Sequence, residues 1–141
     1  MRYFELLDEY NRLKFKLQCN IEEENEIRDL YAPPKRVISG GLGGGEHPAP
    51  QEKYIEAIDE ILRKRALITK EMRGIRDTLI EVLDDNIDDY TAKKIIQMVM
   101  FRDSKTPKWR VVAEKTGYSE SQTRKIYADG RFILDAIEIR K

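Results

Sequence analysis

Cysteine, histidine and long apolar runs are scarce in this sequence. Cys19 is the only cysteine, which excludes an intramolecular disulfide and a structural zinc site built from cysteines. No run of about eighteen apolar residues occurs, so the sequence predicts no membrane-spanning helix and no membrane partner. The segment MRYFELLDEY at the start lacks the apolar stretch of a secretory signal, and we expect a cytoplasmic location.

The single histidine and the glycine-rich segment form no catalytic pattern. His47 lies in KRVISGGLGGGEHPAP, without a second histidine or a positioned serine or cysteine. The glycines miss the spacing of a phosphate-binding loop, and the acidic runs EEENE and DDNIDD lack the ligand spacing of a calcium loop. We therefore expect no enzyme, no cofactor and no metal site, and we interpret residues 33–50 as a flexible connector.

The net formal charge of +0 hides an uneven distribution. Residues 1–89 carry 14 Lys and Arg against 20 Asp and Glu, a balance of −6. Residues 90–141 carry 12 against 6, a balance of +6. Because contacts with phosphates are short-range, the local excess of positive charge indicates the C-terminal third as a nucleic-acid-binding region. The alternative is that the two parts neutralise each other.

Two long helices are predicted in residues 1–85. Their apolar residues recur at alternating spacings of about four and three, which is typical of a coiled coil. The first helix, from about Tyr3 to Tyr31, has a seam of Leu6, Tyr10, Leu13, Leu17, Asn20, Glu24 and Ile27. The second, from about Gln51 to Leu83, has a seam of Tyr54, Ile58, Ile61, Arg65, Ile68, Met72, Ile75, Leu79 and Val82. Pairing within one chain as a helical hairpin and pairing between chains fit this pattern equally well.

Shorter helices are predicted in residues 86–141. The run Asp84–Asp89 is expected to end the long helix and to favour the start of the next one, near Tyr90, through the helix dipole. A following short helix is expected to have Thr106 as its cap and Pro107 in its first turn, with Gly117 ending it. The fold class is thus all-α: a long N-terminal helical hairpin or coiled coil, then a C-terminal helix-turn-helix domain.

The last helix is expected to start at Ser119, which forms a capping box with Gln122. Its buried side is predicted to contain Thr123, Ile126, Tyr127, Ile133 and Leu134. Asp129 and Gly130 are weak helix formers, so the sequence leaves the continuity of this helix in question.

This capped helix, preceded by a glycine turn and a short helix with small Ala113, is typical of a helix-turn-helix. The start of a recognition helix reads base edges in the major groove, where polar side chains match the hydrogen-bonding groups of the bases. The predicted base-reading residues are Ser119, Glu120, Ser121, Gln122, Arg124 and Lys125. The predicted phosphate-binding residues are Lys105, Lys108, Arg110, Lys115 and Arg131. The alternative is an ordinary helical core with a solvated charged face.

The stretch WRVVAEKTGYSESQTRKIYADGRFILDAI resembles the DNA-binding fourth region of bacterial sigma factors. The resemblance rests on Val112-Ala113, Thr116-Gly117, Ser119 and Thr123. Together with a coiled-coil N-terminal part, it is similar to small phage and prophage regulators of Gram-positive bacteria, the ArpU-like and RinA-like activators of late genes. It implies sequence-specific binding to double-stranded DNA, transcriptional regulation, and bacterial RNA polymerase as a candidate partner.

Two other functions fit parts of the pattern. A phage small terminase subunit also combines a helix-turn-helix with oligomerising helices, and it would recognise packaging-site DNA. A protein-interaction adaptor would use the coiled coil as its functional part, with the basic helices docking on an acidic partner. A homo-oligomer formed through the N-terminal helices is an open alternative in each case.

Overall fold

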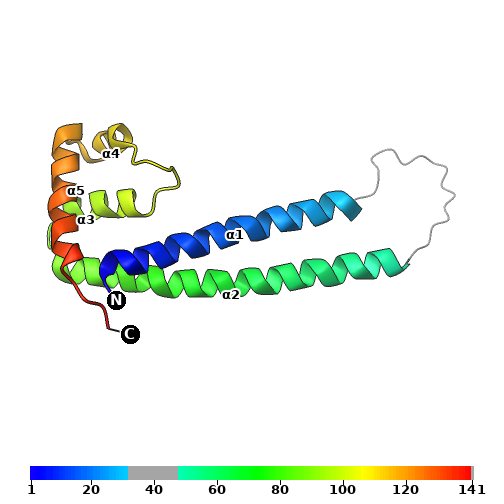
Figure 1. Cartoon of the computed structure of the whole chain (residues 1–141). Coiled ribbons are helices and arrows are strands. Elements are labelled where there is room, and N and C mark those ends of the chain that lie inside the picture. Colours follow the sequence, from blue (N-terminus) through cyan, green and yellow to red (C-terminus); the bar gives the residue numbers. More distant parts are fainter. Residues whose placement is uncertain (32–47, 141) are drawn as a thin grey trace. The chain divides into compact units, whose positions relative to one another are not determined.

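The chain is all-helical in the part that the structure describes. This structure is a computed structural model, and it describes residues 1–31 and 48–140. Within these residues the helices are α1 (Tyr3–Tyr31), α2 (Pro48–Asn86), α3 (Tyr90–Met100), α4 (Trp109–Thr116) and α5 (Glu120–Asp135) (Figure 1). The β pairing found there is an isolated bridge between Arg2 and Glu138. The predicted all-α class is confirmed, while His47 and most of the predicted connector lie outside the described residues.

Two compact units divide the chain, and both long helices contribute to each. The paired-helix unit comprises Arg12–Met72, and the helix-cluster unit comprises Met1–Asn11 and Arg73–Lys141. None of the helices described in residues 1–31 and 48–140 has both the length and the apolar character that a membrane crossing requires.

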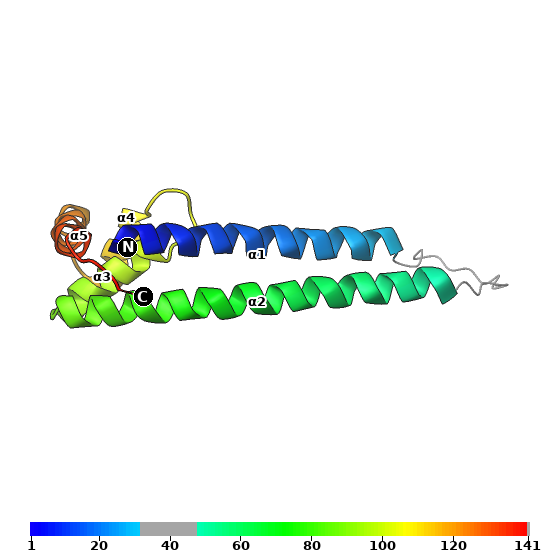
Figure 2. The same ribbon diagram turned by 60° about the horizontal axis from the view of Figure 1, so that its bottom comes forward.

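In the paired-helix unit, the α1 and α2 segments run antiparallel. The amide Nδ2 of Asn20 donates to the carbonyl of Ile61 at 3.0 Å, and Nη1 of Arg28 donates to the hydroxyl of Tyr54 at 3.0 Å. The contact positions rise along α1 as they fall along α2, as the colours of the two helices also show (Figure 2). The seam positions face inward, because Leu13, Asn20, Ile58 and Ile61 are buried.

In the helix-cluster unit, α3, α4 and α5 enclose a small apolar core. Ile95, Val99 and Val112 form its buried centre. Met98, Trp109, Ile126 and Tyr127 pack around that centre. Nearby, the buried hydroxyl of Tyr3 donates to the carbonyl of Leu79 at 2.8 Å, and burial raises the pKa of this tyrosine far above its usual range.

Gly130 lies in the middle of α5, where the sequence left helix continuity in question. The helix runs unbroken from Glu120 to Asp135, and Gly130 is buried on its inner side. A β-carbon at this position would overlap Cδ1 of Ile96 and approach its Cγ1 to 3.2 Å. The glycine therefore permits α5 to pack closely against α3, which explains a weak helix former in the interior of a helix.

The acidic run ends the long helix as predicted, since α2 ends at Asn86, within Asp84–Asp89, and Asp89 caps the start of α3 at Tyr90. Two details of the predicted helices are wrong. Thr106 and Pro107 lie before α4, whose N-cap residue is Lys108 and lacks a side-chain capping bond. The carbonyl of an N-cap residue accepts the first hydrogen bond of its helix. The carbonyl of Thr106 accepts instead from the hydroxyl of Ser104 at 2.6 Å, within the connector. Ile133 is 45% exposed, because Gly130 and Leu134 occupy the inner side of α5.

Candidate nucleic-acid interface

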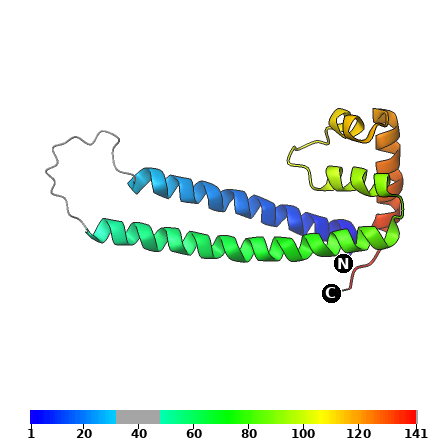
Figure 3. The same cartoon turned by 180° about the vertical axis from the view of Figure 1, so that it is seen from behind.

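A tight turn after α4 sets the start of α5. Gly117 has a φ of 80°, in the left-handed region that favours glycine, and its N–H donates to the carbonyl of Ala113 at 2.9 Å. Ser119 follows as the N-cap of α5. Both features were predicted from the sequence and are confirmed. Figure 3 shows α4, in gold, joined to α5, in orange, by this short turn.

The capping box engages two of the predicted base-reading side chains. The hydroxyl of Ser119 accepts from the N–H of Gln122 at 3.1 Å, and Oε1 of Gln122 accepts from the N–H of Ser119 at 3.2 Å. A bidentate contact with adenine needs both Oε1 and Nε2 of a glutamine. Gln122 would have to leave the capping box to make that contact, so the structure gives Ser119 and Gln122 a clear role in holding the helix start.

The other predicted base-reading residues lie on the exposed side of α5. Glu120, Ser121, Arg124 and Lys125 are all exposed. The guanidinium carbon of Arg124 lies 5.7 Å from the centre of the Trp109 ring, within the range of a cation–π contact. This contact restrains Arg124 against α4, whereas Ser121 and Lys125 lie one turn apart along α5.

The predicted phosphate-binding residues are also exposed, but their surroundings differ. Nε of Arg110 lies 3.7 Å from a carboxylate oxygen of Glu114, one turn further along α4. The guanidinium of Arg131 lies 4.9 Å from the ring centre of Phe4 in α1. Lys108 and Lys115 stand two turns apart and line one pocket, while Lys105, in the connector, offers its carbonyl to Arg102 at 3.4 Å.

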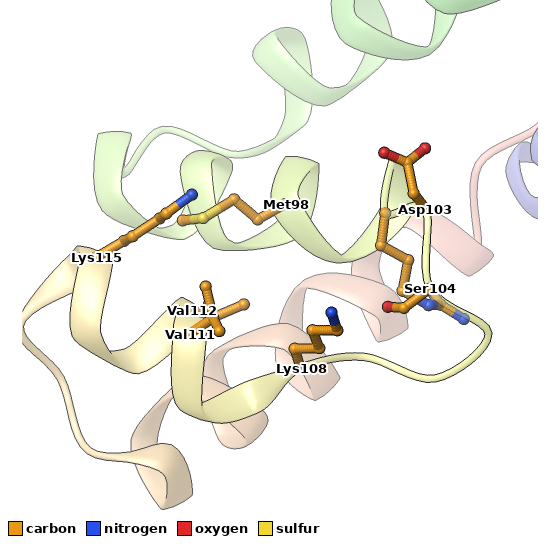
Figure 4. A pocket seen from close by; sticks show the side chains of 8 residues that line it. Met98, Asp103, Ser104, Lys108, Val111, Val112 and Lys115 are labelled. Atoms are coloured by element: carbon orange, nitrogen blue, oxygen red, sulfur yellow. The ribbon is translucent and has the colours of Figure 1, made fainter.

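That pocket lies between α3, the connector after it, and α4, and has a volume of about 280 Å³ (Figure 4). In Figure 4, Val111 and Val112 lie between the side chains of Lys108 and Lys115, and Met98 faces them from α3. Arg102, Asp103 and Ser104 complete the lining from the connector. We refer to it below as the lysine pocket.

Sequence reasoning missed several residues of this region. Met98, Asp103 and Ser104 belong to the lysine pocket, and no spacing in the sequence singles them out. Phe132 is 82% exposed and follows Ser121, Lys125 and Ala128 at helical spacing along the outer side of α5. That spacing could have identified Phe132 as an outward-facing aromatic residue.

In residues 1–31 and 48–140, no group of three or more His, Cys, Asp or Glu side chains is arranged to hold a metal ion. Comparison of the chain with protein-family models, with curated proteins and with solved structures gave no match.

Proposed function

We propose that α4 and α5 form a helix-turn-helix that binds double-stranded DNA sequence-specifically, and that the protein regulates transcription without catalysing a reaction. One observation carries the proposal: the first two turns of α5 expose polar side chains, while its opposite side is buried against α3 and α4. The capping box and the glycine turn hold this exposed surface in place. A fixed, polar helix start is what readout of base edges requires.

In this proposal, the side chains divide into two roles. Ser121, Arg124 and Lys125 contact base edges in the major groove, and Glu120 accepts from cytosine. Lys105, Lys108, Arg110, Lys115 and Arg131 contact phosphates and fix the position of the protein on the duplex. Ser119 and Gln122 stabilise the helix start.

In this proposal, the rest of the chain provides contacts with a partner. The α1 and α2 segments serve as an N-terminal helical hairpin, which contacts a partner or a second copy of the chain. The resemblance of residues 109–137 to the fourth region of sigma factors supports a phage or prophage regulator of the late-gene activator type. Bacterial RNA polymerase is then a candidate partner, and the bacterial cytoplasm the place of action.

The first test measures binding of the purified protein to fragments of its own genome by fluorescence anisotropy, at several salt concentrations. We expect one fragment to bind in the presence of competitor DNA, with an affinity that falls steeply as salt rises because phosphate contacts release counterions. Equal and weak binding to every fragment would leave only non-specific attraction, and the absence of binding at low salt would overturn the proposal.

The second test compares Arg124→Ala with Arg110→Ala on the selected fragment. Loss of a base contact by Arg124 should cost about 1–3 kcal/mol and relax specificity at one base pair. Loss of a phosphate contact by Arg110 should weaken binding to all sequences alike and reduce the salt slope by about 1. Uniform weakening by Arg124→Ala would show that this residue contacts phosphate.

A further inference from the structure

We propose that the lysine pocket binds a small amphipathic carboxylate, with the carboxylate attracted by the rim lysines Lys108 and Lys115 and the apolar body against Met98, Val111 and Val112. The pocket lining has a charged part and an apolar part, which favour different parts of a ligand. Two lysines on the rim favour an anion, and the three apolar side chains favour a hydrocarbon.

The apolar floor is available to a ligand. Val111 is 42% exposed, although it lies beside Val112, which is only 5% exposed and belongs to the buried core. Met98 is half-buried against the same core. Methionine adapts its shape to the groups that contact it, which suits the floor of a ligand site. Covering Val111 and Met98 with hydrocarbon would remove apolar surface from water and stabilise the complex.

The wall formed by the connector is held in place before any ligand arrives. Nη1 of Arg102 donates to the carbonyl of Val99 at 2.7 Å, and its Nη2 donates to the carbonyl of Lys105 at 3.4 Å. The hydroxyl of Ser104 donates to the carbonyl of Thr106 at 2.6 Å. These bonds tie the connector to α3 and to itself, so ligand binding need not order this wall.

The size and the charges of the pocket limit the ligand. A volume of about 280 Å³ lies just below the usual range for sites that hold drug-sized molecules, so the ligand is small. Asp103 contributes one carboxylate to a lining that also contains Lys108, Lys115 and Arg102, so the lining has an excess of positive charge. A carboxylate with a short aliphatic chain, such as hexanoate, matches both limits.

The direct test uses nuclear magnetic resonance of the ¹³C-labelled methyl groups of Met98, Val111 and Val112. The intact protein is titrated with hexanoate, with the neutral analogue hexan-1-ol, and with acetate, which lacks the apolar body. We expect saturable shifts of these methyl signals with hexanoate, and weaker binding of both analogues. Absence of saturable shifts, or equal affinity for hexanoate and hexan-1-ol, would overturn the proposal.

Three charge variants sharpen the test. Lys108→Gln and Lys115→Gln should each weaken hexanoate binding about two- to five-fold and leave the binding of hexan-1-ol unchanged. Asp103→Asn should strengthen hexanoate binding, because it removes a like charge from the rim. All three residues are exposed, and the methyl signals of buried Val99 check that the core is intact. Hexanoate affinity that none of these variants changes would contradict the assigned site.

One consequence rests on the proposed function. Because Lys108 and Lys115 are also assigned to DNA phosphates, bound hexanoate should weaken DNA binding more than acetate does at equal ionic strength. Hexanoate binding without any DNA binding would support the proposed ligand site and overturn the proposed DNA binding. DNA binding without hexanoate binding would support the proposed DNA binding and overturn the proposed ligand site.

Discussion

The paired-helix unit and the helix-cluster unit specify their packing by different means. In the paired-helix unit a polar side chain enters the seam: Asn20 is 5% exposed, donates to the carbonyl of Ile61, and accepts from Nε of Arg65 at 2.8 Å. In the helix-cluster unit, Thr123 is fully buried, but its hydroxyl bonds locally to the carbonyl of Glu120 at 2.8 Å.

This difference shows how each unit selects one arrangement. Two long helices with repeated apolar positions can slide by a heptad and still bury similar side chains, so a polar pair across the seam favours one alignment. Three short helices have few equivalent packings, and their alignment follows from caps, the turn and close contacts such as that of Gly130 with Ile96.

The largest effect should follow from loss of apolar volume in the helix-cluster unit. Ile95 has no exposed surface, so Ile95→Ala should lower the free energy of unfolding by about 3 kcal/mol, through lost burial and a residual cavity. Ile68→Ala makes the same chemical change at a half-buried seam position and should cost about 1 kcal/mol. Urea denaturation followed by circular dichroism measures both, and equal losses would contradict the contrast between the units.

A smaller effect should follow from loss of the polar pair in the seam. Asn20→Ala removes both the cross-seam donor to the carbonyl of Ile61 and the acceptor for Nε of Arg65, and should cost about 2 kcal/mol. Gln18→Ala, on the exposed side of the same helix, is the matched control and should cost little. A double-mutant cycle of Asn20 with Arg65 should give a non-zero coupling energy. Full additivity would show that the two side chains do not stabilise each other.

The capping box should contribute less to the free energy of unfolding than the polar pair in the seam does. Ser119→Ala removes the acceptor for the N–H of Gln122 and should lower the free energy of unfolding by about 1 kcal/mol. Ser121→Ala deletes the same hydroxyl two residues later, where it caps nothing, and should leave stability nearly unchanged. Denaturation of the two variants side by side checks this. Under the proposed function, Ser121→Ala should instead reduce DNA affinity.

The smallest effect should be on how the stability of the paired-helix unit changes with pH. Hydrogen bonding from Arg28, and then from Arg65, lowers the pKa of Glu24 below its ordinary value of 4.5. The ionised form is therefore favoured in the folded state, so its contribution to stability is present above pH 4.5 and is lost as the pH falls through the lowered pKa. Denaturation at several pH values should show a shallower acid-side loss for Glu24→Gln than for the wild type.

The control for this pH dependence is Glu23→Gln, which removes an exposed carboxylate from the neighbouring position of the same helix. It should follow the wild-type pH profile. Identical profiles for Glu24→Gln and the wild type would contradict the assigned ion pairs, of which Arg65 Nη2 to Glu24 Oε1 measures 2.6 Å.

The sequence predicted those parts of the structure that depend on local chemistry. Helical spacing located both long helices, and the turn and capping residues located Gly117 and Ser119 because each acts on its own backbone. The start of α4 was missed, since the bond from Ser104 to the Thr106 carbonyl depends on how the connector folds. The burial of Gly130 and the lining of the lysine pocket were missed because they arise from contacts between helices that local patterns do not encode.

The most direct test of DNA recognition by α5 is selection of bound sequences from a pool of randomised duplexes, with the wild type and with Arg124→Ala. The proposal predicts that the wild type enriches one sequence motif and that the variant loses preference at a single base pair of that motif. Enrichment of no motif by the wild type, with only salt-sensitive binding to all duplexes, would contradict sequence-specific recognition by this helix.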